Sequence, residues 1–195
     1  AAAFGGPEAL RRHAFTPLWL GYIGAVNAWT YRRAGVCLLT RRPGTLLGLL
    51  AASVVFWWAF EYLNQFTHNW HYAGLTQRGD WGYFLAASPP FATVLAAVIS
   101  TRDLLTTFPR LAAGLGSAWR PPALPRGVWP GLGLGLGGVG LVAVGVSGAW
   151  FFPLLWVAPL LVIWGVQGVA GEPTLATEAG AGDWRPVWLA ALAAL

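Results

Sequence analysis

The sequence predicts an all-α protein, a polytopic transmembrane helical bundle of five to six spans that forms a single transmembrane domain over residues 1–195. Composition is the first observation, because 56% of the residues are hydrophobic and only 10% are charged, whereas soluble domains carry about 25% charged residues. The second is a mean hydropathy of +0.57. The third is that the apolar residues gather in runs, several of them near the length of about 20 residues that a transmembrane helix needs. We therefore expect most of the chain to lie in lipid.

Each expected span follows from one apolar run. The first begins at a proline, which suits a first helical turn, and the third contains Pro89-Pro90, which should kink it and free backbone carbonyls. The fifth follows the fourth so closely that the two should form a hairpin. A sixth run, 186–195, has only ten residues, too few to cross a core of about 30 Å, so we expect the protein to continue. The five longer runs cover residues 17–31, 44–66, 82–100, 131–150 and 153–169.

Arginine supplies all of the positive charge. The chain has twelve basic residues, all of them Arg, and a formal net charge of +5. They lie between apolar runs, which indicates flanks that orient membrane helices and excludes a nucleic-acid partner. The connectors 32–43 and 101–130 hold four arginines each, so both are predicted to be cytoplasmic. The expected location is the bacterial inner (cytoplasmic) membrane, and the expected partners are the lipid bilayer and other membrane subunits.

Polar side chains gather at the end of the second run. Glu61 falls inside this predicted helix, where a carboxylate costs about 2.5 kcal/mol or more at the bilayer centre and usually faces the protein interior. Helical spacing places several other polar residues on the same face, two of them only if the helix continues to residue 72. We call this set the polar seam, a candidate binding or proton-handling site. Its members are Glu61, Asn64, Gln65, His68, His71 and Tyr72, with Asn27 of the first run added.

Two roles for Glu61 are open at this point. In one, the desolvated carboxylate handles protons. In the other, it is a structural hydrogen-bond partner of Asn64, of Asn27, or of backbone near Pro89-Pro90. Asn27 has the same two interpretations, a ligand contact or an interhelical hydrogen bond.

The histidines and tryptophans raise the question of bound groups. His68 and His71 are three positions apart, a spacing that on a helix allows them to share a metal or to ligate separate porphyrin metals. The alternative is that they belong to the aromatic and polar belt at the bilayer surface. Thirteen tryptophans are present, and deep indoles favour flat hydrophobic partners such as carotenoid, chlorin, quinone or a neighbouring subunit. Packing in the bundle core is the alternative for Trp57, Trp58 and Trp164.

The fourth run is rich in glycine. It contains a G-x-G-x-x-G pattern, but no strand precedes it and no acidic residue follows at the distance that a dinucleotide site requires. Pairs of glycines four positions apart instead predict a groove for close helix packing. These glycines are Gly131 with Gly135 and Gly133 with Gly137.

An internal duplication is one interpretation of the chain. Each copy would be a three-helix unit, residues 15–100 and residues 151–195, the second of them truncated. The identities are few, so chance similarity is the alternative. A shift of 136 positions aligns Pro17-Leu18 with Pro153-Leu154 and Ala34-Gly35 with Ala170-Gly171.

Two short motifs carry a resemblance. They are Trp-x-x-x-Glu-x-x-Asn, from Trp57 to Asn64, and Asn-Trp-x-Tyr, from Asn69 to Tyr72; the segment 182–186 adds to the likeness in the second half. With these motifs the chain resembles an uncharacterised family of bacterial polytopic membrane proteins over most of its length. The resemblance implies a duplicated helical bundle and no known activity, so it assigns no role to any residue.

Two functional hypotheses remain. The first is a non-catalytic integral membrane subunit that packs within a larger photosynthetic or respiratory assembly, because seven acids and three histidines leave few titratable groups among many packing surfaces. The alternative is a membrane-embedded enzyme or carrier for an isoprenoid, a quinone or another lipid-like substrate. In that case Glu61 would act as acid and base, and Asn64 and His68 would orient the substrate.

Overall fold

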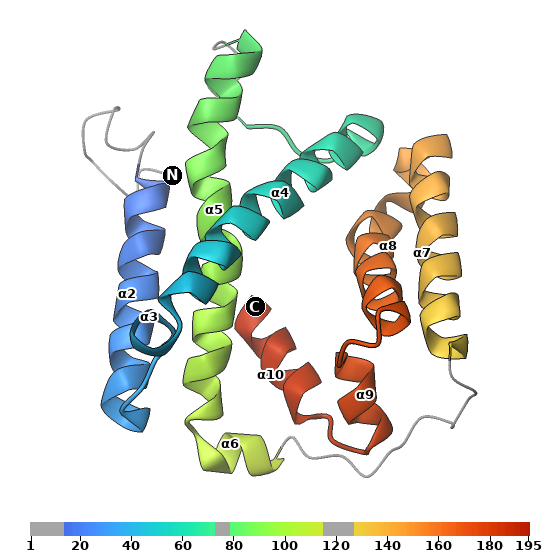
Figure 1. Cartoon of the computed structure of the whole chain (residues 1–195). Coiled ribbons are helices and arrows are strands. Elements are labelled where there is room, and N and C mark those ends of the chain that lie inside the picture. The colour runs from blue at the N-terminus through green and yellow to red at the C-terminus, as the bar shows by residue number, and fades with distance from the viewer. Residues whose placement is uncertain (1–13, 73–78, 115–126) are drawn as a thin grey trace. The chain divides into compact units, whose positions relative to one another are not determined.

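The structure is a computed structural model that describes residues 14–72, 79–114 and 127–195 (Figure 1). These residues form helices and connecting segments and contain no strand, so the predicted all-α class is confirmed. The helices in chain order are α2 (Phe15–Ala34), α3 (Leu38–Arg41), α4 (Pro43–Thr67), α5 (Gly79–Thr106), α6 (Pro109–Gly114), α7 (Val128–Val146), α8 (Gly148–Val169), α9 (Leu175–Gly180) and α10 (Arg185–Ala194).

Four of the described helices, α4, α5, α7 and α8, are long and apolar enough to cross a membrane. They correspond to the second to fifth predicted runs and fit a multi-pass membrane protein. The sequence predicted five to six spans. Helix α2 has 20 residues, but Asn27, Thr30 and two arginines make it more polar than the other four, and α10 has only 10 residues. Part of the predicted cytoplasmic connector 101–130, residues 115–126, lies outside the described residues.

The chain divides into two compact units. Among the described residues, the first unit comprises 14–57, 79–114 and 188–195, and the second comprises 58–72 and 127–187. Helix α4 therefore contributes residues 43–57 to the first unit and residues 58–67 to the second.

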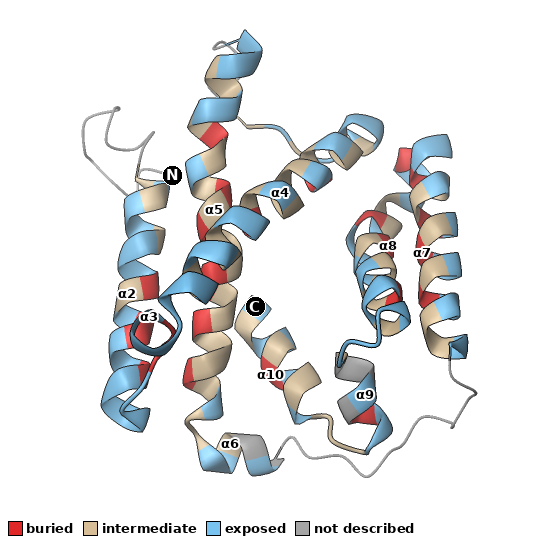
Figure 2. Ribbon diagram, in the orientation of Figure 1, coloured by how far each residue is buried: buried red, intermediate tan, exposed pale blue. Residues whose placement is uncertain are grey.

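In the first unit, α2 packs on α5. The contact centres on Ile23 of α2 and on Ala96 and Ala97 of α5, which are all buried. Figure 2 shows buried positions along both helices. Two consecutive alanines leave room for the partner side chain and for the leucines of α4 that cover the cluster. A buried hydrogen bond 2.9 Å long, from Asn27 Nδ2 to Ser100 Oγ, joins the same two helices.

Helix α5 continues through Pro89-Pro90 without interruption. A proline inside a helix lacks the N–H that normally pairs with a carbonyl one turn earlier. In α5, hydroxyl groups lie beside the backbone that follows the two prolines. Ser53 of α4 donates to the carbonyl oxygen of Phe91 at 2.5 Å and accepts a hydrogen bond from the N–H of Leu95 at 3.2 Å. Thr93 donates to the carbonyl oxygen of Pro90 at 2.7 Å. Polar groups of the chain itself thus bind the backbone next to the proline pair.

In the second unit, α7 and α8 form the predicted hairpin, joined at Ser147. Glycines of α7 allow the close contact. A Cβ added at Gly137 would lie 2.7 Å from Cγ2 of Val162 and 2.9 Å from the carbonyl oxygen of Ala158. Gly133 meets α8 in the same way, with the carbonyl oxygen of Leu161 2.9 Å from an added Cβ.

The predicted glycine groove is therefore only partly in this contact. Gly131 and Gly135 have no neighbouring atom within 4 Å of an added Cβ, because their positions on the helix face away from α8. The G-x-G-x-x-G pattern lies inside α7, and two of its glycines, Gly137 and Gly140, are buried against α8.

Candidate functional site

The candidate site lies in the second unit, where the chain folds back on the last turns of α4. The helix ends at Thr67, and His68 adopts a left-handed backbone with φ of 48°. Residues with a Cβ rarely adopt this conformation outside turns and helix ends. The next residues then return toward the helix instead of extending it. This reversal determines which polar residues meet.

The side chain of Asn64 holds the returning segment. Its Oδ1 accepts the backbone N–H of Asn69 at 2.9 Å and that of Trp70 at 3.3 Å, and its Nδ2 donates to the carbonyl oxygen of Trp70 at 2.8 Å. Thr67 donates its hydroxyl to the same Oδ1 at 3.2 Å. One carboxamide thus pairs backbone groups of the returning segment, which lies outside the helical hydrogen-bond ladder.

Glu61 binds two side chains at the end of the returning segment. Its Oε1 accepts hydrogen bonds from the indole Nε1 of Trp70 at 2.8 Å and from the hydroxyl of Tyr72 at 3.0 Å. All three side chains are partly buried. Hydrogen bonds to a charged group contribute about 1.5–3 kcal/mol each, so this carboxylate is a strong anchor for residues 70–72. We call Glu61, Asn64, Trp70 and Tyr72 the return cluster.

Aromatic rings surround the return cluster. The Trp70 ring lies 5.6 Å from the ring of Trp156 of α8, centroid to centroid, and the buried Phe60 lies 5.2 Å from that same Trp156. The first residue of α8 also touches the end of α4, because an atom added at Gly148 would collide with the carbonyl group of Phe66. Rings at such separations add to the packing between α8 and the returning segment.

The structure brings together three members of the predicted polar seam, Glu61, Asn64 and Tyr72. Gln65, His68 and His71 are exposed, and their side chains make no described contact with these three; His68 bonds Asn64 only through its backbone N–H, 2.8 Å from the Asn64 carbonyl oxygen. The spacing argument placed the two histidines on a continuing helix, but the helix ends one residue before His68. No described group of three or more His, Cys, Asp or Glu side chains is arranged to hold a metal ion.

Asn27 belongs to the first unit and is a buried interhelical partner there. It is 1% exposed. Its Nδ2 donates to Ser100 Oγ and to the carbonyl oxygen of Ile23, and its Oδ1 accepts the N–H of Leu39 at 3.3 Å. The structural interpretation of Asn27 is the one that these bonds favour.

Sequence reasoning did not identify Trp70 and Trp156 as parts of the site. Trp70 was noted as part of the Asn-Trp-x-Tyr motif and was given no role in the polar seam. Its role depends on the chain reversal, and no helical period points to it. The deep tryptophans make contacts within the protein, since Trp57 packs against Phe91 and Trp164 donates a hydrogen bond to Thr174 at 3.3 Å.

No protein-family model matches the chain, and neither a curated protein nor a solved structure shows significant similarity to it.

Proposed function

We propose that the protein is a non-catalytic integral membrane subunit that packs within a larger membrane assembly of the photosynthetic or respiratory kind. The observation that carries the proposal is the use of Glu61. The acid inside an apolar helix is a natural candidate for chemistry, and here one of its oxygens anchors the indole of Trp70 and the hydroxyl of Tyr72. Asn64, one turn further along, uses its side chain to hold the segment that follows the same helix.

The large exposed surface of the candidate membrane-spanning helices supports packing within a larger assembly. In the most apolar 18-residue windows of α4 and α8, 17% of the residues are buried within the chain, and the value for α5 is 33%. The remaining apolar surface needs lipid or other apolar helices against it. Trp81 and Trp150 are 78% and 85% exposed, and such indoles suit both the bilayer interface and flat partners such as pigments, quinones or neighbouring subunits.

The proposal includes a topology in the bacterial inner membrane. The arginine-rich connectors 32–43 and 101–130 are placed in the cytoplasm. Helix α2 is then a fifth span, and the return cluster lies on the opposite side of the membrane. The hairpin connection at Ser147 lies on the same side as the return cluster.

Internal duplication is also part of the proposal. Helices α2, α3 and α4 follow the order long, short, long, and α8, α9 and α10 repeat the order of a long helix, a short helix and an apolar helix. The glycines that follow α2 and α8 both have a left-handed backbone, with φ of 71° at Gly35 and 75° at Gly171. Before each short helix a backbone N–H donates to a threonine hydroxyl three residues on, Cys37 to Thr40 and Thr174 to Thr177, both at 3.1 Å. These local features recur 136 or 137 positions apart.

The assembly is tested by its size in a mild detergent. The tagged chain, extracted from its own membranes, should elute as a particle much heavier than the 20.8 kDa of the chain, with other membrane proteins at fixed stoichiometry. An absorption spectrum of that particle identifies bound carotenoid or porphyrin. A stable, solitary monomer would contradict the proposal.

Variants at Glu61 and Tyr72 test the structural role. Tyr72→Phe removes one donor and should lower the free energy of unfolding by about 1–3 kcal/mol. Glu61→Ala should have the larger effect, because it leaves two partly buried donors without their acceptor. Glu61→Gln keeps an acceptor oxygen and should retain assembly and most of the stability. Thermal unfolding in detergent measures all three. If Glu61→Gln instead preserves the fold and abolishes a turnover of a lipid-like substrate, Glu61 is an acid or base and the proposal fails.

A further inference from the structure

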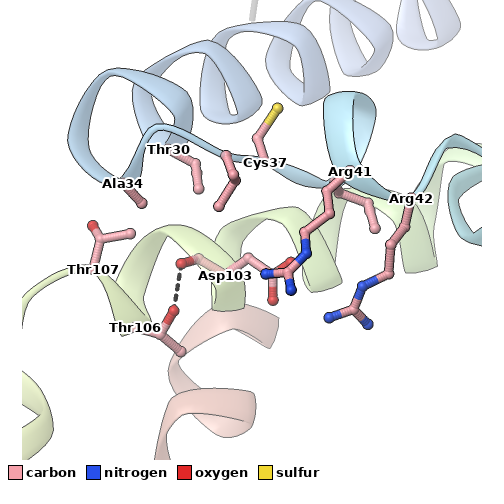
Figure 3. A pocket seen from close by; sticks show the side chains of 10 residues that line it. Thr30, Ala34, Cys37, Arg41, Arg42, Asp103, Thr106 and Thr107 are labelled. Atoms are coloured by element: carbon pink, nitrogen blue, oxygen red, sulfur yellow. Dashed lines mark hydrogen bonds between the residues drawn. The ribbon is translucent and has the colours of Figure 1, made fainter.

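We propose that a cavity in the first unit binds a phosphate group, carried by an anionic lipid headgroup or by a soluble phosphate. The cavity has a volume of about 210 Å³ and lies where the C-terminal turn of α2, the short helix α3 and the last turns of α5 meet (Figure 3). Its lining is polar for a membrane protein. The residues that carry the argument are Arg41, Arg42, Asp103, Thr106 and Thr107.

The two arginines supply the donors. Each guanidinium has five N–H donors and binds phosphate through a planar fork. Arg41 and Arg42 both line the cavity from the end of α3. Their backbone N–H groups donate to the carbonyl oxygens of Cys37 and Leu38, whereas neither guanidinium donates a hydrogen bond to another described residue. Figure 3 shows both side chains reaching down beside α5, on the side of Asp103.

A third arginine at this end of the unit, Arg33, differs because its guanidinium donates hydrogen bonds within the protein. Arg33 donates from Nε to the hydroxyl of Thr107 at 2.7 Å and from Nη2 to the carbonyl oxygen of Thr107 at 2.9 Å. Its guanidinium also lies 3.8 Å from the centroid of the Phe108 ring. Arg33 therefore fastens α2 to the end of α5, whereas Arg41 and Arg42 present their donors to the cavity.

The charge of the lining favours an anion. Arg41 and Arg42 carry two positive charges against the single carboxylate of Asp103, which is half-buried in the wall. The same carboxylate gives an acceptor for a hydroxyl group next to the phosphate, as in a glycerol headgroup. Basic pockets between transmembrane helices on the cytoplasmic side are places where anionic headgroups bind, and the proposed topology puts this end of α2 on that side. The binding itself does not depend on the proposed assembly.

Lipid and phosphate titrations of the detergent-solubilised full chain test the proposal. The probes are phosphatidylglycerol, phosphatidylcholine and inorganic phosphate at constant ionic strength, and native mass spectrometry and the thermal midpoint report binding. The test variant is Arg41→Gln/Arg42→Gln. The matched control is Arg32→Gln/Arg110→Gln, which removes the same charge from two exposed arginines outside the cavity lining.

We expect the protein to bind phosphatidylglycerol or inorganic phosphate. The test variant should weaken this affinity roughly tenfold or more, and the control variant should leave it within about twofold of the unmodified protein. Preference for phosphatidylglycerol over both other probes assigns the site to a lipid, and binding of inorganic phosphate assigns it to a soluble ligand. Absence of binding by either, or equal loss in the two double variants, overturns the proposal. If the double variant does not fold, as judged by circular dichroism, the single variants Arg41→Gln and Arg42→Gln replace it, with Arg32→Gln as control.

Discussion

At the scale of single residues, Asp183 and Arg185 form a local pair at the start of α10. Asp183 Oδ1 accepts the backbone N–H of Arg185 at 3.1 Å and its Nε at 2.8 Å. The hydrogen bond from the Arg185 side chain is the main reason why the pKa of the Asp183 carboxyl lies below its usual range. A carboxylate just before a helix also accepts a backbone donor that the first turn leaves unpaired.

This pair predicts a dependence on pH. Because the pKa of Asp183 is lower in the folded protein than in the unfolded chain, its contribution to stability is present above the unfolded pKa and is lost as the pH falls through the folded pKa. Carboxyl NMR of the solubilised protein should show Asp183 titrating below an ordinary aspartate. Arg185→Gln should bring the titration back toward the usual range. An unchanged titration in that variant would mean that Arg185 is not the cause.

The return cluster shows what spacing along a sequence can and cannot predict. The interval from Glu61 to Asn64 correctly placed two polar groups on one face of α4, and Tyr72 does reach Glu61. The reason given for Tyr72, a continuing helix, was wrong. One left-handed residue, His68, reverses the chain, and helical periodicity carries no information about such a reversal. The polar run Thr67-His68-Asn69 after Phe66 was the signal that the helix would end there.

At the scale of elements, helix limits followed from composition to within a few residues. The predicted run 44–66 became α4, Pro43–Thr67, whereas 82–100 became the longer α5, Gly79–Thr106. The prediction stopped at residue 100 because Arg102 and Asp103 signal the membrane surface. The backbone continues past them, since a helix can emerge from the bilayer with its ladder of hydrogen bonds intact. Apolar composition therefore locates the lipid-facing part of a helix better than its end.

The glycines of α7 make a prediction at this scale. Gly137→Ala places a methyl group against Val162 and the backbone of α8, and overpacking of this kind typically costs about 1–3 kcal/mol. Gly135→Ala is the matched control. It lies two positions away with nothing within 4 Å of its added Cβ, so it should be neutral or stabilising by up to about 1 kcal/mol, the usual gain over a helical glycine.

Unfolding of the two variants in a denaturing detergent, followed by tryptophan fluorescence, measures the difference. Equal effects of Gly135→Ala and Gly137→Ala would mean that the α7–α8 contact tolerates a methyl group. The sequence alone proposed both glycine pairs, because spacing by four defines a stripe on a helix but does not say which of several stripes faces the neighbour.

At the scale of the whole molecule, sequence composition predicted a multi-pass helical protein, and four described helices can cross a membrane. The division of α4 between two compact units was not predicted, because the apolar run through residues 57 and 58 shows no change of composition there. The number of spans depends on α2. Its length is sufficient, and its buried Asn27 is paired within the protein, which lowers the cost of placing that amide in lipid.

Labelling from either side of the membrane decides whether α2 crosses. Cys37 is the only cysteine, so a Cys37→Ser background allows single cysteines at Ala14, His68, Ser147 and Glu172. In intact cells a membrane-impermeant thiol reagent should label the variants His68→Cys and Ser147→Cys, and it should reach Glu172→Cys only in inverted vesicles. If α2 is a span, Ala14→Cys is labelled together with position 68, because α2 and α4 then cross in opposite directions. If Ala14→Cys is instead labelled together with position 172, α2 lies on the cytoplasmic surface and does not cross. If positions 68 and 147 are labelled from different sides of the membrane, the proposed topology is wrong.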